Sequence, residues 1–291
     1  MTSAQSVNVE QHTNQGIQEI YDEAASYYQQ LRWFKTPLTR LEYAQTEAAL
    51  LDQFQFIPDN KGRYLEIGCG PGTWTKVVAA HSAEVVALDI SANMIEQARR
   101  YIGDATNVTF VHGDAAHYQP EGRLDGFFSF RVIEYIDGWQ ETLKRVAEHV
   151  PSGGRAVICT KTPISVYRGT GRERWFTTGV KRTLGKVQRR LSGQPEPPAD
   201  DRFWQKYISP AALQAVLEQS GFTDFSIAPA IYGLPIFWRG TCQYPLVPQF
   251  AEPPFMWAFE EGRKLASRLP LGARRLSLIF SESYVLSATK R

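Results

Sequence analysis

Three glycines and an acid in the first third of the chain have the types and spacing of a nucleotide-binding turn. The stretch YLEIGCGPGTW places Gly68, Gly70 and Gly72 directly after an apolar run. Glycines in such a turn let the backbone approach a ligand closely. Asp89 lies 21 residues after Gly68 at the end of the next apolar run, where a carboxylate can accept hydrogen bonds from ribose hydroxyls. The spacing therefore predicts a site for a ribose-containing ligand.

Two features separate this turn from a dinucleotide-binding turn. The dinucleotide fingerprint has a small residue where this chain has Thr73, because that residue lets the following helix pack closely. Glu66, two residues before the turn, would repel a pyrophosphate but suits a ligand with an ammonium or sulfonium charge. The pattern thus disfavours NAD, and a nicotinamide-dependent oxidoreductase is the remote alternative. A tight turn that binds no ligand is a further alternative.

Short apolar strands alternate with amphipathic helical segments around the turn. Five strands are expected in the stretches RYLEIG, EVVALDI, VTFVHGD, LDGFFSF and GRAVICT, and TDFSIAPAI and SYVLSATK could add two more. Runs that are apolar on both sides of the strand alternation are typical of parallel strands with helices on each face. The order predicts an α/β fold with a doubly wound, mostly parallel sheet.

Changes in this alternation of strands and helices divide the chain into seven segments. Residues 1–16 are polar and are expected to form a disordered tail. Residues 17–58 have a helical pattern, with a second helix beginning near Pro37, a residue suited to a first helical turn. The other expected segments are a ligand-binding core at 59–160, a basic insertion at 161–207, a continuation of the core at 208–230, an aromatic and Pro-rich insertion at 231–282, and a last core strand at 283–291.

Composition limits the class of protein. A formal net charge of +2 and a charged fraction of 21% do not indicate a dedicated nucleic-acid-binding protein. Cys69, Cys159 and Cys242 are far apart and show no metal-ligand spacing. The N-terminus lacks the pattern of a signal peptide, and no run reaches the roughly 18 apolar residues of a membrane span. We therefore expect a cytoplasmic protein without a metal site.

Five motifs in order resemble those of the class I S-adenosylmethionine-dependent methyltransferases. They are LEIGCGPGTWT, VVALDIS, HGDAAHY, FFSFRVIEYI and VPSGGRAVI, and together they span roughly residues 60–160. The resemblance implies a Rossmann-like fold with a seven-stranded sheet whose last strand is antiparallel. It also implies S-adenosyl-L-methionine as the cofactor and methyl transfer as the activity.

The resemblance assigns a role to one or more residues of each motif. The cofactor-binding residues would be Glu66, Gly68, Gly70, Gly72, Asp89, Ile90, Met94, Asp114, Ala115, Arg131 and Tyr28. The glycines would meet the amino-acid end of the cofactor, Asp89 the ribose and Asp114 the adenine amino group. Arg131 would contact the methionine portion, and Glu66 would orient it together with the turn.

Several of these residues also fit plain structural roles. Ile90 and Met94 could belong to the core, Arg131 could pair with a surface acid, and Asp114 could cap a helix. The N-terminal helices resemble the lid of the family, where Tyr21, Tyr27 or Tyr28 would close over the cofactor. Alternatively, these helices pack on the sheet.

Methyl transfer from a sulfonium depends mainly on alignment and desolvation of the reactants. A base is needed only where the acceptor carries a proton, as a hydroxyl does. Glu134 and Tyr135 in VIEYI are the candidate catalytic residues, and Asp137 and His117 are further candidates for the base. A helix-start acid and a packing aromatic are the alternative roles of Glu134 and Tyr135.

Both insertions carry an excess of bases. Nine basic residues and one acid lie between Lys161 and Leu191, and residues 262–280 contain five bases and no acid. The segments 174–191 and 262–280 are typical of helices at an anionic membrane surface. A packed helix with solvated bases is the alternative interpretation, and RNA binding is a third one that the nearly neutral net charge disfavours.

The aromatic and Pro-rich run 231–259 is expected to form the wall of an apolar acceptor pocket. Such a pocket suits a lipid, a planar natural product or a quinone precursor. We therefore predict methyl transfer to a small-molecule or lipid-like acceptor, at oxygen or carbon. The basic segments indicate a membrane surface as a location for this reaction. The alternative is a non-catalytic S-adenosylmethionine-binding protein with a regulatory or assembly role.

Overall fold

The structure is a computed structural model that describes residues 3–54, 56, 61–164, 205–232 and 252–291. Seven strands of the described chain form one sheet in the order β3-β2-β1-β4-β5-β7-β6. Their bounds are β1 Arg63–Ile67, β2 Glu84–Asp89, β3 Val108–His112, β4 Gly126–Phe130, β5 Arg155–Lys161, β6 Phe222–Tyr232 and β7 Ser281–Lys290. The chain moves outward from β1 to β3 and then returns to β4. The order therefore reverses between β1 and β4, where open α/β sheets bind their ligands.

The sheet is mostly parallel. Leu65 of β1 lies opposite both Val86 of β2 and Phe127 of β4 in parallel register. The last strand, β7, runs antiparallel to its two neighbours, with Ile158 of β5 and Ile227 of β6 both opposite Leu286. The prediction of a doubly wound, mostly parallel sheet with an antiparallel last strand is confirmed.

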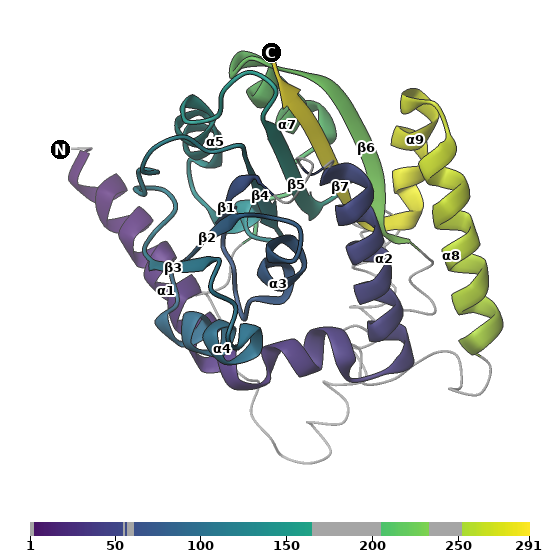
Figure 1. Ribbon diagram of the computed structural model, residues 1–291, viewed down its shortest axis with the longest axis horizontal. Coiled ribbons are helices and arrows are strands. Elements are labelled where there is room, and N and C mark those ends of the chain that lie inside the picture. Colours follow the sequence, from purple (N-terminus) through teal and green to yellow (C-terminus); the bar gives the residue numbers. More distant parts are fainter. Residues whose placement is uncertain (1–2, 55, 57–60, 165–204, 233–251) are drawn as a thin grey trace.

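Helices cover both faces of this sheet (Figure 1). Their bounds are α1 Ser3–Gln29, the π-helical turn η1 Gln30–Phe34, α2 Pro37–Phe54, α3 Thr73–Ala79, α4 Ala92–Ile102, the 3₁₀ turn η3 Ile133–Tyr135, α5 Trp139–Glu148, α7 Pro210–Gln219, α8 Glu252–Arg268, α9 Leu271–Ser277 and the 3₁₀ turn η8 Leu278–Phe280. Helix α2 begins at Pro37 as predicted. The Ser91 side chain caps α4, and Ser209 caps α7 with Pro210 in its first turn.

Three borders differ from those predicted. Helix α1 begins at Ser3, inside the segment 1–16 that we expected to be disordered. Extending an existing helix adds one backbone hydrogen bond per residue without a new nucleation step, so polar residues can continue it. Strand β6 also runs on to Tyr232, and β7 begins at Ser281. The basic stripe 174–191 lies outside the described residues.

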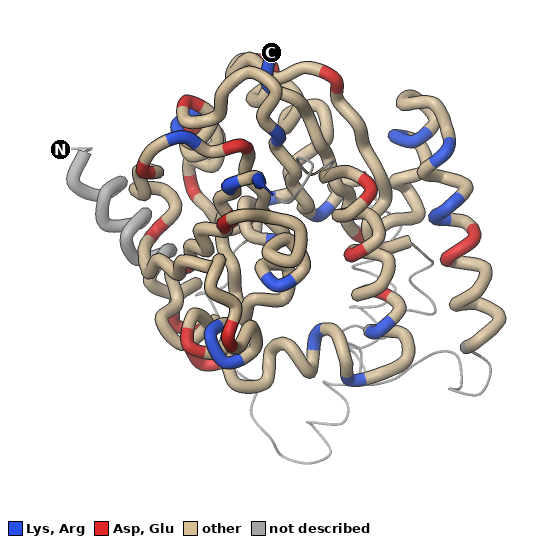
Figure 2. The backbone as a smooth tube through the Cα atoms, viewed as in Figure 1, with Lys and Arg blue, Asp and Glu red and all other residues tan. Residues whose placement is uncertain are grey.

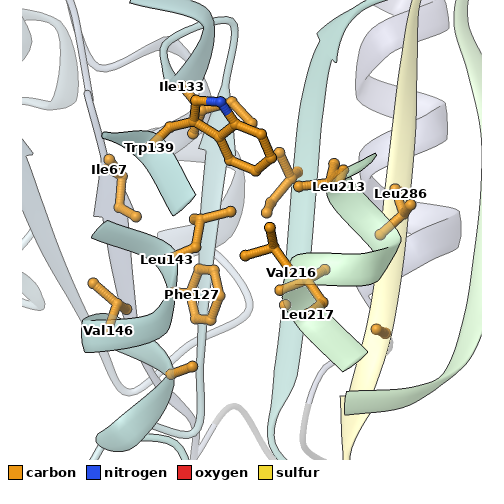
Figure 3. Packing of buried hydrophobic residues seen from close by; sticks show 14 of the residues in the cluster. Ile67, Phe127, Ile133, Trp139, Leu143, Val146, Leu213, Val216, Leu217 and Leu286 are labelled. Atoms are coloured by element: carbon orange, nitrogen blue, oxygen red, sulfur yellow. The ribbon is translucent and has the colours of Figure 1, made fainter. Parts of the chain in front are cut away.

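The core lies on both sides of the sheet. Figure 3 shows Trp139, Leu143 and Val146 of α5 facing the Leu and Val side chains of α7, with Phe127 of β4 beneath them. On the other face of the sheet, Leu50 and Phe54 of α2 pack with buried hydrophobic side chains of β4 and β5. Because helices occupy both faces, the carboxyl ends of the strands are the part of the sheet left for a ligand.

Positions of Lys and Arg and positions of Asp and Glu are interspersed along the described backbone (Figure 2). No helix in the described ranges combines the length and the apolar character that crossing a membrane requires. Within the same ranges, no three potential metal-binding side chains come together. Cys69 and Cys159 are buried thiols.

Candidate functional site

A pocket lies at the carboxyl ends of β1, β2 and β4, and α1 and η1 form its other side. The predicted residues that line it are Tyr28, Gly68, Gly70, Asp89, Ile90, Met94, Asp114, Ala115, Arg131 and Tyr135. Three predicted residues, Glu66, Gly72 and Glu134, are not among the lining residues. The fold thus brings most of the predicted site together around one cavity.

The three glycines of the turn meet three different requirements. Gly68 has a φ of +76°, and a Cβ there would lie 2.4 Å from the Val132 side chain. Gly70 has a φ of +50°, but a Cβ would meet open space, because this residue faces the pocket. Gly72 has a φ of +81° and approaches Ala98 of α4 closely, so it serves helix packing rather than ligand contact. The cofactor contact expected of Gly72 is therefore corrected.

Asp89 ties the glycine turn to the end of β2. Its carboxylate accepts hydrogen bonds from the Gly70 N–H at 2.7 Å and from the Ser91 N–H at 2.9 Å. Burial raises the pKa of Asp89, and these two hydrogen bonds oppose the rise. The carboxylate thus lines the pocket with its position fixed by the backbone.

Asp114 and Ala115 follow β3 at the same end of the pocket. The Asp114 carboxylate accepts a hydrogen bond from the Ala116 N–H at 2.8 Å. Asp114 begins a hydrogen-bonded turn, and no helix follows it, so the alternative of a helix cap is wrong. The residue lines the pocket as well. Ile90 and Met94 lie nearby, with Met94 only 1% exposed, so they belong to the wall and to the core at once.

Glu66 lies behind the turn instead of in the pocket. Its side chain is fully buried on β1, and Oε2 accepts a hydrogen bond from the Thr75 hydroxyl of α3. Burial raises the pKa of Glu66 well above its ordinary value, and the nearby Asp89 raises it further. This carboxyl joins β1 to α3 through Oε2, and its Oε1 is buried without a hydrogen-bond partner among the described residues. The expectation that Glu66 orients the turn and the methionine portion stays a prediction.

At the opposite end of the pocket, a neighbouring carboxylate fixes a guanidinium group in place. Arg131 follows β4 with a φ of +64°, and its Nε donates a 2.8 Å hydrogen bond to Glu134 Oε1. Its Nη1 lies 3.9 Å from Glu282 Oε1 on β7. Nη1 is buried and has no hydrogen-bond partner among the described residues. Arg131 therefore lines the cavity while its Nη1 is buried on the side of Glu282.

Glu134 is positioned to hold Arg131, not to contact a substrate. It is 0% exposed, and its second oxygen, Oε2, accepts a 2.7 Å hydrogen bond from the Thr160 hydroxyl. Since both oxygens are engaged and the residue is absent from the pocket lining, its predicted role as a catalytic base is corrected. The spacing Arg131–Glu134, three residues apart around a turn, was visible in the sequence.

Tyrosines line the pocket on the side of α1. Tyr135 and Tyr21 stand edge to face with ring centroids 5.9 Å apart, and Tyr21 meets Tyr28 at the same distance. Burial raises the pKa of Tyr21 and of Tyr135, and for Tyr135 the charge of Glu134 raises it further. These phenols are therefore protonated at neutral pH. Tyr27, another lid candidate, is 53% exposed and lies outside the lining.

Helix α1 is attached to the core on both sides of the pocket. The Asp22 carboxylate accepts hydrogen bonds from the Ser91 hydroxyl and, at 3.3 Å, from the Asn93 N–H at the start of α4. The Gln29 side chain donates to Thr73 Oγ1 at 3.2 Å. The tyrosine side is thus held over the cavity by contacts at the beginnings of α4 and α3.

Arg32 and Trp33 are the residues that sequence reasoning missed. Arg32 of η1 lines the pocket, pairs with the buried Glu42 of α2 and lies 4.2 Å over the Trp33 ring. A single base in a helix carries no signal by itself. However, Tyr21, Tyr28 and Arg32 are spaced seven and four residues apart, which places them on one helical face.

Residues 65–154 match the family model described as a methyltransferase domain. The chain is 32% identical over 134 residues to trans-aconitate 2-methyltransferase of Afipia carboxidovorans, covering 45% of this chain and 50% of that protein. It is 29% identical over 123 residues to malonyl-[acyl-carrier protein] O-methyltransferase 1 of Ilyobacter polytropus, covering 40% and 46%. The alignments thus span about half the length of these relatives.

A solved structure resembles nearly the whole chain. Magnesium protoporphyrin IX methyltransferase of Synechocystis PCC 6803 with bound SAH aligns with a TM-score of 0.54 and 11% identity, covering 96% of this chain and 100% of that one. At this identity the likeness concerns the fold, which both chains share.

Proposed function

Since residues 65–154 form a domain of the class I methyltransferase family, whose cofactor is S-adenosylmethionine, we propose that this chain transfers a methyl group from that cofactor to a small-molecule or lipid-like acceptor. Oxygen and carbon are the favoured acceptor atoms. The observation that carries the proposal is the division of charge within the pocket. Acids lie at one end and guanidinium groups at the other.

The residues present fit the cofactor from end to end. Asp89 and Asp114 can accept hydrogen bonds from its ribose hydroxyls and adenine amino group. The backbone at Gly68 and Gly70 leaves room for the amino-acid end, because no Cβ fills the space beside Gly70. The guanidinium of Arg131, which lines the pocket, is a donor for its carboxylate. Ile90, Met94 and Ala115 would pack around the adenine.

The bound cofactor supplies a methyl group on a sulfonium. This chain's residues would then orient the acceptor and exclude water. Tyr21, Tyr28 and Tyr135 form the aromatic part of the enclosure, and Glu134 keeps Arg131 in place. Tyr135 can act as a hydrogen-bond donor to the acceptor, since its raised pKa keeps the phenol protonated.

The relatives support a small acceptor. Two of them are named for trans-aconitate and for malonyl-[acyl-carrier protein], and the second is an O-methyltransferase. Oxygen is therefore the first acceptor atom to test in this chain.

Helices α8 and α9 support a peripheral membrane location. They expose large apolar side chains, with Trp257 69%, Leu265 65% and Leu276 77% exposed. Lys264 and Arg268 are exposed on the same two-helix unit, and Figure 2 shows its basic residues. An exposed apolar surface with bases suits an anionic lipid surface on the cytoplasmic side. Sedimentation with phosphatidylserine vesicles tests this location, which Trp257→Ala and Leu276→Ser should weaken and a Glu96→Ala control should not.

The first experiment is calorimetric titration with S-adenosylhomocysteine and, in parallel, with NAD, on wild type and Asp89→Ala. Binding of S-adenosylhomocysteine alone, lost in the variant, supports the cofactor site. Binding of NAD instead would support the oxidoreductase alternative.

The non-catalytic alternative needs a second measurement. A protein that only senses the cofactor binds it but forms no methylated product with any pool of acceptors. Radiolabelled methyl transfer into a deproteinised cell extract and a lipid extract separates the two functions.

A further inference from the structure

The charges at the end of the pocket that Arg32 and Arg131 line restrict the chemistry of the acceptor. This inference rests on the proposed methyl transfer. Two guanidinium groups line this end, Arg32 from η1 and Arg131 from the end of β4. The cofactor has only one carboxylate, and the guanidinium of Arg131, which Glu134 holds at the end of β4, is placed to take it. Arg32 is then the second cation at the same end.

Among the described residues, the charges that pair around the two arginines are equal in number before anything binds. The cations are Arg32, Arg131 and Lys161, and the facing carboxyls are Glu42, Glu134 and Glu282. The cofactor adds a sulfonium, an ammonium and a carboxylate, which is one net positive charge. Burial raises the pKa of Glu42 to about 7, so part of one negative charge is also lost at neutral pH. With the cofactor bound, this end has an excess of positive charge that an anion would compensate.

Among the lining residues that the structure describes, none is placed as a base for a neutral acceptor. The phenols of Tyr21 and Tyr135 have raised pKa values, and burial raises that of the Cys69 thiol as well. The carboxylates of the lining belong to the strand ends β2 and β3, where the ribose and adenine would lie. Glu134 is turned away and engaged. An acceptor that is already ionised needs no base.

Arg32 is built to hold such an ion in one place. Its guanidinium lies over the Trp33 ring, and the buried Glu42 engages its Nη1. Stacking and a buried partner fix the planar group, which favours bidentate hydrogen bonds to carboxylate or phosphoryl oxygens. A lysine would be a less directional partner at this position.

We propose that the acceptor is an oxyanion, held by Arg32 and methylated on one of its own oxygens. A lone pair of the acceptor oxygen forms the new O–C bond while the C–S bond breaks, and the electrons of that bond stay on sulfur. The negative charge of the oxyanion and the positive charge of the sulfonium disappear together, and no proton is moved. Such a charge-cancelling step is favoured in an enclosed, water-poor site.

Binding measurements show which arginine holds the carboxylate of the cofactor and which one remains for the acceptor. S-adenosylhomocysteine carries the cofactor's carboxylate, and 5′-methylthioadenosine lacks it. Arg131→Gln should weaken S-adenosylhomocysteine about tenfold or more, as loss of a charged hydrogen bond does, and leave 5′-methylthioadenosine unchanged. Arg32→Gln should leave both affinities within about twofold, a change smaller than one such bond. A fall for S-adenosylhomocysteine alone in Arg32→Gln would overturn the proposal, because Arg32 would then hold the cofactor.

Arg32→Gln leaves Glu42 buried without its cation, so a folding control is needed. The double variant Arg32→Gln/Glu42→Gln removes both charges, and Arg32→Lys keeps the cation while removing the planar fork. Both should retain S-adenosylhomocysteine binding. Loss of binding in the double variant, with melting temperature preserved, would again place the cofactor at Arg32.

Product analysis tests the acceptor itself. Wild type with ¹³C-methyl-labelled cofactor is incubated with a deproteinised extract and a panel of carboxylates and phosphonates. An alkali-labile methyl group released as methanol identifies a carboxylate, and a methyl resonance split by ³¹P identifies a phosphoryl group. A methyl group on carbon, nitrogen or an alkali-stable ether overturns the oxyanion and leaves the proposed methyl transfer intact. If no product forms although S-adenosylhomocysteine binds, the methyl-transfer proposal fails and this inference with it.

Discussion

Arg131 and Glu134 form a buried ion pair that connects the end of β4 to the pocket. Arg131 Nε lies 2.8 Å from Glu134 Oε1, and the Arg131 backbone has a φ of +64°. A left-handed conformation costs a non-glycine residue on the order of 1 kcal/mol or more, so its surroundings must maintain it. The Arg131 N–H donates to Cys159 O at 2.8 Å, and Glu134 accepts from Thr160. β5 therefore holds both members of the pair.

Removing the carboxylate at Glu134 should release Arg131. We expect Glu134→Ala to lower the free energy of unfolding by roughly 3 kcal/mol or more, because a buried guanidinium loses its partner. Glu134→Gln keeps a hydrogen-bond acceptor, so its free energy of unfolding should fall by less. Chemical denaturation measures the stability, and titration with S-adenosylhomocysteine should show weaker binding in both variants. Unchanged stability and binding in Glu134→Ala would contradict the positioning role.

Alanine substitutions at Gly68 and Gly70 should have different effects, the first mainly on stability and the second mainly on ligand binding. Gly68→Ala places a Cβ 2.4 Å from Val132 at a φ of +76°, so the turn must move. Gly70→Ala meets open space at a φ of +50° and should cost only about 1 kcal/mol of conformational strain. We expect Gly68→Ala to lower the melting temperature strongly, whereas Gly70→Ala lowers it little and mainly weakens S-adenosylhomocysteine. Equal melting temperatures in the two variants would be inconsistent with this difference.

Glu42 should make stability depend on pH. Burial raises its pKa from 4.5 to about 7, and Arg32 opposes the rise. Since the folded-state pKa lies above the unfolded one, the associated stabilisation is complete below pH 4.5 and is lost as the pH rises to about 7. At about 1.4 kcal/mol per pKa unit, the loss is on the order of 3 kcal/mol.

Glu42→Gln is the matched test of this pH dependence. Unfolding free energies of wild type and variant are compared at several pH values between 4.5 and 7.5. The free energy of unfolding of the variant should increase relative to that of wild type as the pH rises. Asp89 and Glu66 titrate in both proteins, so their contributions cancel in this difference. A constant difference across this range would rule out Glu42 as the titrating group.

Asp22 should control how firmly α1 covers the pocket. Its carboxylate accepts hydrogen bonds from the Ser91 hydroxyl and the Asn93 N–H at the start of α4. Asp22→Ala should therefore raise the dissociation rate of S-adenosylhomocysteine and the hydrogen exchange of residues 17–29, with little change in global stability. Glu96→Ala, which removes an exposed ion pair on α4, is the control. Identical dissociation rates in Asp22→Ala and wild type would show that α1 is not a cover.

The fold could be read from the sequence because its determinants are local. The strand RYLEI, the glycines of the turn and the cap at Ser91 each act within a few residues, and strand alternation with helical periodicity indicated a parallel sheet. The adenosine end of the pocket is local in the same sense, since Asp89 and Asp114 simply follow the strands β2 and β3. The border at Ser3 differed because a polar segment can extend an existing helix.

The sequence by itself determined the topology and the acids at the strand ends. Tertiary structure decided what the other charged residues face. Glu134 turns away from the pocket because Thr160 on β5 and Arg131 engage its oxygens, and Arg32 enters the pocket because Glu42 on α2 pairs with it. Partners such as Thr160 lie on other elements of the fold. Side-chain direction at a site depends on such long-range contacts, which residue spacing along one strand or helix does not contain.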